Sequence, residues 1–252
     1  MEIERSGGMT FERGGAGDAL LVLIHGLAAT ARVWAPMLEQ APRRWPGRWI
    51  APDLRGHGGS AAAGSYTTAD YATDIAELIA KSGASSVTLL GHSMGGVIAL
   101  ALAGGEVRAE RVFGLGIKVA WTDDELGRLA SVAQRQPKLF DQETEAREQH
   151  RRQCGLTCAP DSPLLDRGTV EQGGEWRTVL DQAAFAVARP AMEQLVAGAR
   201  CPVHLACGEH DAMVSMEQLR ALDPHARRID GAGHNAMVDD PDAIWGWIDG
   251  AA

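Results

Sequence analysis

Aromatic side chains and cysteines are both scarce in this sequence. Seven tryptophans, two tyrosines and four phenylalanines make up 5% of the 252 residues, and there are four cysteines. The sequence contains no Cys-x-x-Cys pair that is accompanied by a second such pair or by two nearby histidines, so a structural zinc site has little support. We expect no metal and no cofactor, and we expect Cys207, at the end of an apolar run, to be buried.

Long hydrophobic runs and positive charge are also in short supply. The longest apolar run, residues 19–24, is far shorter than the ~20 residues that span a bilayer, and the charged N-terminal segment lacks the apolar stretch of a secretory signal. Asp and Glu (33) outnumber Lys and Arg (24), and the net charge of -9 repels phosphate backbones and anionic lipids. These features predict a cytoplasmic protein without a nucleic-acid or membrane partner, and they leave the oligomeric state open.

Glycine, by contrast, is abundant. The 30 glycines exceed the roughly 18 that an average share of about 7% would give. The fold must therefore contain many turns with unusual backbone angles. The length of 252 residues fits one α/β domain with an insertion.

Short apolar runs rich in valine, isoleucine and leucine recur along the chain. Most do not alternate with polar residues, which is typical of strands buried on both faces of a parallel sheet. The expected strands are residues 20–24, 49–52, 87–90, 112–117, 203–207 and, more weakly, 227–230. Residues 2–5 and 10–13 are expected to form an antiparallel hairpin at the sheet edge.

Helical periodicity separates most of these runs. In residues 68–81, Ala72, Ile75 and Ile79 recur on one face, and Thr67 with Asp70 gives an N-terminal capping pattern. Weaker helical patterns occupy residues 34–40, 95–103, 216–222 and 241–248. The alternation of strands and helices predicts the α/β class with a doubly wound, mostly parallel sheet.

The segment 118–190 has a different character, being polar and without a strand-like run. Helical patterns cover residues 123–135 and 143–152, and the glycine- and proline-containing tract 158–174 is typical of a loop. Insertions at the carboxyl ends of parallel strands commonly cover ligand clefts. We therefore predict a helical lid over residues 118–190, inserted into a core formed by residues 1–117 and 191–252.

The sharpest local motif is Gly-His-Ser-Met-Gly-Gly at residues 91–96, between an apolar strand and an apolar helix. On such a tight turn the small glycines keep neighbouring Cβ atoms away, and the hydroxyl of Ser93 stands above the sheet as a candidate nucleophile. Its oxyanion would be stabilised by backbone amides, for which we predict those of Leu27, in the turn after a strand, and Met94.

A serine nucleophile needs a base and an orienting carboxylate. Asp211 and His234 each follow a strand-like segment, in the chain order that this kind of site requires. Glu209 and Asp239 remain alternatives for the carboxylate. His25, His57 and His92 are interpreted as residues that organise loops.

Together these motifs resemble the α/β-hydrolase superfamily, in its compact, lidded, esterase-like branch. The matching segments are LVLIHG at 21–26, PDLRGHGGS at 52–60, GHSMGG at 91–96, GEHD at 208–211 and GAGH at 231–234. The resemblance implies a triad of Ser93, His234 and Asp211, oxyanion amides from Leu27 and Met94, and a structural role for the loop 53–60.

The resemblance predicts a cofactor-independent serine hydrolase acting on a small-molecule carboxylic ester or lactone. Two alternatives stay open: a carbon–carbon bond hydrolase or lyase with the same triad, and a non-catalytic hydrolase-fold receptor. Carbon–carbon hydrolases usually carry tryptophan after the catalytic histidine, where Asn235 stands here. Epoxide hydrolases and haloalkane dehalogenases use an aspartate in place of Ser93.

Specificity is expected to come from the insertion. Lys118 and Trp121 follow a strand where the insertion begins, so Lys118 is either a group that recognises a substrate carboxylate or carbonyl, or a solvated hinge lysine. Trp176 and Phe185 either line an apolar pocket or dock the insertion onto the core.

Overall fold

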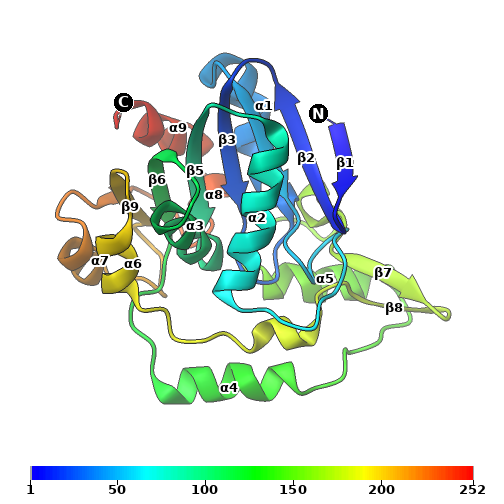
Figure 1. Ribbon diagram of the computed structural model, residues 1–252. Helices are drawn as coiled ribbons and strands as arrows, with labels where there is room; N and C mark the ends of the chain where they lie inside the picture. Colours follow the sequence, from blue (N-terminus) through cyan, green and yellow to red (C-terminus); the bar gives the residue numbers. More distant parts are fainter. Residues whose placement is uncertain (1, 252) are drawn as a thin grey trace.

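The computed structural model describes residues 2–251, and its centre is an eight-stranded sheet (Figure 1). The strand order is β1-β2-β4-β3-β5-β6-β9-β10. Strands β1 and β2 pair antiparallel at one edge, β2 also pairs antiparallel with β4, and the pairs from β4 through β3 to β10 are parallel. The strands are β1 (Glu2–Ser6), β2 (Met9–Gly15), β3 (Ala19–Ile24), β4 (Arg48–Pro52), β5 (Ser86–His92), β6 (Ala109–Leu115), β9 (Val203–Gly208) and β10 (Arg227–Ile229).

Helices cover both faces of the sheet, and the predicted strands and helices of the core are confirmed. The helices are α1 (Ala35–Arg44), α2 (Thr68–Ser82), α3 (Met94–Gly104), α6 (Met192–Gly198), α7 (Met216–Leu222), α8 (Ala236–Asp239) and α9 (Pro241–Asp249), with a 3-10 turn, η1, at Ala31–Trp34. The capping pattern is also confirmed, because Thr67 and Asp70 form a reciprocal capping box at the start of α2.

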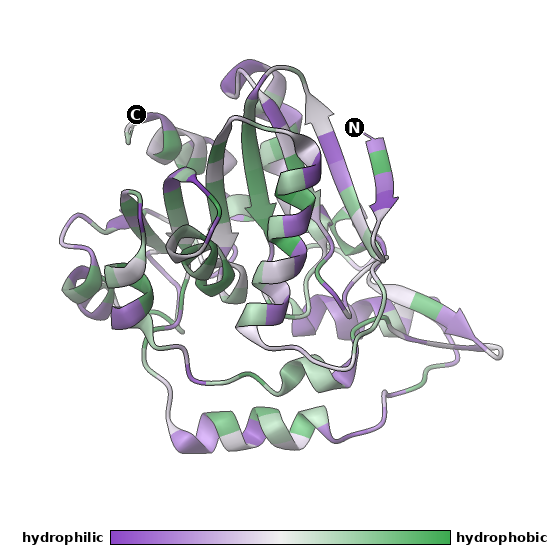
Figure 2. Ribbon diagram, viewed as in Figure 1, coloured by the Kyte–Doolittle hydropathy of each residue, from purple (hydrophilic) through white to green (hydrophobic). Residues whose placement is uncertain are grey.

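The central strands are apolar throughout because each of their faces contacts a different core. In β3, Leu20, Val22 and Ile24 pack in the core that contains α2 and α3, whereas Leu21 and Leu23 pack in the core that contains α1 and α9. Figure 2 shows these strands and α3 as almost uniformly hydrophobic. Cys207 at the end of β9 is 1% exposed, as predicted.

The chain between β6 and α6 is the segment predicted to be an insertion, and it is called the insertion below. It contains α4 (Asp123–Ala133), α5 (Glu143–Gln153), η2 (Pro163–Leu165), β7 (Thr169–Gln172), β8 (Glu175–Thr178) and η3 (Gln182–Phe185). These elements lie beyond the carboxyl ends of the parallel strands, on the side to which the arrowhead of β3 points (Figure 1). Helix α4 has no buried residue and packs mainly on η3, so it forms the outer part of the insertion.

The expectation that the insertion lacks strands is wrong. Strands β7 and β8 form an antiparallel hairpin within and just beyond the tract expected to be a loop. Its two-residue turn consists of Gly173 and Gly174, which have φ angles of +68° and +89° that favour glycine at both positions. The strands escaped prediction because they are short, polar and half exposed, and therefore carry no apolar run.

Candidate active site

Ser93 occupies the sharp turn between β5 and α3. Its φ and ψ angles are 52° and -118°, an unfavourable conformation for a residue with a side chain. The turn needs glycine on both sides, because a Cβ atom on Gly91 would lie 2.1 Å from the carbonyl oxygen of Gly95, and one on Gly95 would lie 2.1 Å from that of Ile24. The amide of Ser93 donates to the carbonyl of Leu115 at 2.8 Å, which fixes the turn over β6.

His234 and Asp211 lie at the same edge of the sheet and contact each other. Nδ1 of His234 lies 2.8 Å from Oδ2 of Asp211, whose side chain is fully buried, while that of His234 is 18% exposed. The other carboxylate oxygen of Asp211 accepts from the amide of Met213 at 2.9 Å. With the proton of the imidazole on Nδ1, facing the carboxylate, Nε2 is left as a proton acceptor.

The two alternative carboxylates have other partners. Glu209 accepts from the amide of Gly231 at 2.9 Å, and Asp239 accepts from the amide of Gly233 at 2.8 Å. Both therefore hold the backbone of the loop that carries His234, and Asp211 is the carboxylate that contacts the imidazole.

His92, the residue before Ser93, contacts His234 through both its ring nitrogen and its ring face. Its Nε2 lies 2.9 Å from the carbonyl oxygen of His234, and the two rings are 4.6 Å apart. Burial, and then the neighbouring imidazole of His234, lower the pKa of His92 well below its usual value. A neutral His92 donates from Nε2 to this carbonyl, which confirms its interpretation as an organising residue.

The turn after β3 passes directly beside Ser93. A Cβ atom on Gly26 would lie 3.1 Å from that of Ser93, and Ala28 has a φ of +66°. Side chains of the core hold this turn and its neighbour: Nε2 of His57 accepts from the amide of Ala28 at 3.2 Å, and Nε2 of His25 accepts from that of Leu54 at 3.0 Å. Both histidines organise loops, as predicted.

Ser93, His234, Leu27 and Met94 line one cavity of about 760 Å³. This volume is within the range of sites for small molecules. The insertion contributes a large part of the wall, including Trp121, Leu129, Phe185 and Val187. The predicted nucleophile, base and oxyanion residues are therefore brought together in a single space.

The four insertion residues singled out from the sequence have different positions. Lys118, Trp121 and Phe185 line the cavity. Trp176 is not among the lining residues and lies in the β7–β8 hairpin, where its backbone pairs with Phe140. The ammonium group of Lys118 forms an ion pair with Glu125 and lies 4.8 Å from the centre of the Trp121 ring, so its charge already has partners.

Sequence reasoning did not identify the contacts between the insertion and the catalytic edge. The thiol of Cys154 donates to the carbonyl of Ala28 at 3.1 Å, and the amide nitrogen of Asn235 lies 3.1 Å and 2.9 Å from the carbonyls of Cys154 and Gly155. The end of α5 is thus held between the turn after β3 and the loop of His234. No local signal marks such contacts, because they join distant parts of the chain.

Among residues 2–251, no group of three or more His, Cys, Asp or Glu side chains is arranged to hold a metal ion. Within the same residues, every helix is too short or too polar to cross a bilayer.

The buried histidines make stability depend on pH. Burial lowers the pKa of His25, His57, His92 and His150, to about 3 for His57 and about 4 for His150. In the unfolded chain these groups have a pKa of about 6.5. Below that pH the unfolded state binds protons that the folded state does not, so the free energy of unfolding decreases as the pH falls.

We expect the free energy of unfolding to fall by about 1 kcal/mol for each such histidine as the pH is lowered from 7.5 to 5.5. Urea unfolding at several pH values measures it. The dependence should be weaker in His150→Gln and unchanged in His210→Gln, whose imidazole is exposed. Stability that stays constant over this range would contradict the expectation.

Residues 21–246 of the chain match the protein family that is described as "Alpha/beta hydrolase family". The chain therefore belongs to the alpha/beta hydrolase family.

Individual relatives place the chain within this family only broadly. The uncharacterized protein Rv2715 of Mycobacterium tuberculosis is 36% identical over 94 residues, which are 37% of this chain and only 27% of that protein. The 2-succinyl-6-hydroxy-2,4-cyclohexadiene-1-carboxylate synthase of Klebsiella pneumoniae is 26% identical over 249 residues, covering 92% of this chain and 93% of that one. The thioesterase domain from the curacin biosynthetic pathway is similar in structure, with a TM-score of 0.81, 21% identity and coverage of 98% and 97%.

Proposed function

We propose that this protein is a serine hydrolase that cleaves a carboxylic ester or a lactone through an acyl-enzyme on Ser93. The observation that carries this proposal is the position of Ser93 on a strained strand-to-helix turn, in the cavity that His234 also lines, with Nδ1 of His234 2.8 Å from the buried carboxylate of Asp211. That arrangement supplies a nucleophile, a base and an orienting group together.

The reaction follows from the proton positions. His234 accepts the hydroxyl proton of Ser93 at Nε2 while Oγ attacks the carbonyl carbon, and Asp211 stabilises the resulting imidazolium. The amides of Leu27 and Met94 donate to the oxyanion. The ester bond then breaks, and His234 gives its proton to the leaving alcohol. Water, deprotonated by the same histidine, releases the acid and restores Ser93.

The composition of the cavity indicates an apolar acyl or alcohol group. Trp121, Leu129, Phe185 and Val187 of the insertion face the same space as Val97 of the core. We propose that the insertion acts as a lid whose side chains set the preference for the substrate. Lys118 is a weak candidate for binding a substrate carboxylate because Glu125 already neutralises it.

A second candidate is a carbon–carbon bond hydrolase or lyase that uses the same three residues. It is favoured by the similarity to the Klebsiella pneumoniae synthase, which extends over 92% of this chain. A third, the non-catalytic receptor, would retain the cavity without turnover.

Active-site labelling tests whether Ser93 is the nucleophile. A fluorophosphonate probe, which reacts with activated serines, should label the wild-type protein and should not label Ser93→Ala. Labelling that survives in Ser93→Ala would refute the assignment of the nucleophile. A wild-type protein that takes no label would favour the receptor.

A substrate panel then separates the chemistries. For nitrophenyl esters from acetate to decanoate, we expect kcat/KM to rise with acyl length, by up to about fourfold per methylene, until the apolar cavity is filled. Lactones extend the panel, and a vinylogous diketone serves as the carbon–carbon substrate. Turnover of the diketone with no turnover of any ester or lactone would replace the proposal with the second candidate.

A further inference from the structure

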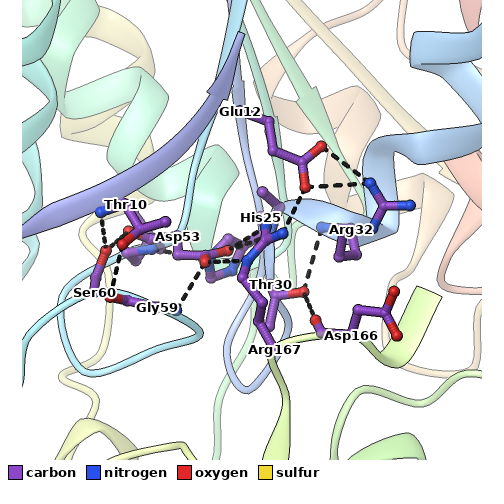
Figure 3. Close-up of polar contacts among 12 residues, drawn as sticks. Thr10, Glu12, His25, Thr30, Arg32, Asp53, Gly59, Ser60, Asp166 and Arg167 are labelled. Carbon is purple, nitrogen blue, oxygen red and sulfur yellow. Dashed lines mark hydrogen bonds and ion pairs between the residues drawn. The ribbon is translucent and has the colours of Figure 1, made fainter. Parts of the chain in front are cut away.

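A buried cluster of four charged residues lies next to the turn after β3 (Figure 3). Glu12 and Asp53 have side chains with no exposure to solvent, and Arg32 and Arg167 are only 14% and 19% exposed. Nη1 of Arg32 lies 3.2 Å from both carboxylate oxygens of Glu12, and Nη1 of Arg167 lies 2.8 Å from one of them. The four formal charges balance, as buried ions require.

Asp53 connects this cluster to the turn. Its Oδ1 accepts from the amide of Ala31 at 2.7 Å, and its Oδ2 accepts from the amide of Gly59 at 2.9 Å. Arg167 contacts both of these oxygens, with Nε 2.8 Å from Oδ2 and Nη2 3.3 Å from Oδ1. A two-point contact of this kind fixes the orientation of the carboxylate as well as its charge.

Arg167 comes from the insertion and reaches this place at a cost in backbone strain. Its φ is +64°, in the left-handed region that disfavours residues with a Cβ. The carbonyl of the preceding residue, Asp166, accepts from the hydroxyl of Thr30 at 3.3 Å, directly before Ala31, whose amide donates to Asp53. Such strain persists where surrounding contacts enforce it, often at functional sites.

We propose that Arg167 is a positioning residue for hydrolysis, which holds residues 26–31, and with them the amide of Leu27, through Asp53. The inference rests on the proposed function, in which that amide donates to the oxyanion. Without Arg167, Asp53 would be a buried carboxylate that keeps its backbone donors but loses the guanidinium that contacts both of its oxygens. It would take up a proton or water, and either change alters its hydrogen bond to Ala31.

The chemical consequence is a less well placed oxyanion donor. A displacement of about 1 Å near the reacting groups can lower the rate by about 100-fold. Because the donor acts on the carbonyl group, the loss should not depend on the rest of the acyl chain. If Arg167 merely braced the insertion, its loss would instead disturb the apolar wall, raise KM and affect long acyl chains more than short ones.

The test compares Arg167→Gln and Arg167→Lys with Arg147→Gln, using nitrophenyl acetate and octanoate. Arg147 is a matched control in the insertion: it is 14% exposed and contacts Asp166 and the carbonyls of Pro160 and Ser162, with no contact to Asp53. We expect Arg167→Gln to lower kcat about 10- to 100-fold for both esters, with KM within about threefold. Arg167→Lys should recover part of the loss, and Arg147→Gln should stay within about twofold of wild type, since it leaves Asp53 untouched.

Hydrogen exchange supplies a readout that needs no substrate. In Arg167→Gln the peptide that covers residues 25–31 should exchange faster than in wild type, whereas Arg147→Gln should leave it unchanged. If exchange at residues 25–31 is unaltered in Arg167→Gln, or if this variant keeps the wild-type kcat, the positioning role is overturned while the proposed function still holds. A loss confined to KM or to octanoate has the same consequence. If the wild type hydrolyses no ester or lactone of the panel, both the proposed function and this inference fail. If Arg167→Gln does not fold, Arg167→Lys carries the same comparison.

Discussion

Ser93→Ala is expected to lower kcat for ester hydrolysis by about a million-fold, with KM within a few-fold of wild type. The hydroxyl is the atom that forms the acyl-enzyme, and nothing else on this turn can replace it. The binding surface stays intact, because the side chain is small and the φ of 52° is set by the neighbouring glycines and by the hydrogen bond to Leu115. Steady-state kinetics with the best ester of the panel measures the effect.

The matched control is Ser85→Ala, an exposed serine directly before β5, at the opposite end of the strand from Ser93. It should leave kcat and KM unchanged. A Ser93→Ala enzyme that retains more than a tenth of the wild-type kcat would show that the reaction proceeds without this nucleophile.

His234→Ala is expected to have an effect of similar size, with kcat lower by about 10⁵- to 10⁶-fold. Without the imidazole the hydroxyl of Ser93 loses its proposed proton acceptor, and Asp211 remains as a buried carboxylate whose ring partner is gone. Because the three groups act as a unit, the double variant of Ser93→Ala and His234→Ala should be little worse than either single variant.

The control for this variant is His210→Ala. His210 precedes Asp211 in the same loop, but its imidazole is 68% exposed and lies 4.0 Å from the carboxylate of Glu209. It should retain wild-type kcat. If the double variant instead multiplied the two single losses, Ser93 and His234 would be acting independently and the proposed mechanism would be wrong.

Much of the fold was predictable because its signals are local. The apolar runs of the central strands report burial on both faces, and the Thr67 and Asp70 capping box marks the first turn of α2. The short helices α6 and α8 and the β7–β8 hairpin were not predicted. They are brief or polar, and their stability comes from packing on the rest of the chain, which a single segment does not reveal.

The candidate site was predictable where short motifs fix the backbone. Gly91 and Gly95 define the turn of Ser93, and the position of His234 after a strand-like segment, in the expected chain order, suggested the base. The sequence favoured Asp211 and left Glu209 and Asp239 as alternatives; the structure adds that Asp211 contacts the imidazole while the other two contact backbone amides of the same loop. Likewise, only the structure separated Trp121 and Phe185, which line the cavity, from Trp176, which does not.

The sequence by itself determined the α/β architecture, the strained serine turn and the set of polar residues at the carboxyl ends of the strands. These features depend on backbone conformation and on periodic burial, and both are determined by residues that are close together in the sequence. The tertiary structure alone decided how the insertion meets the core. The contacts of Arg167 with Asp53 and of Cys154 with Ala28 join residues more than a hundred positions apart. Such contacts depend on how whole elements pack against one another, and no local sequence pattern predicts them.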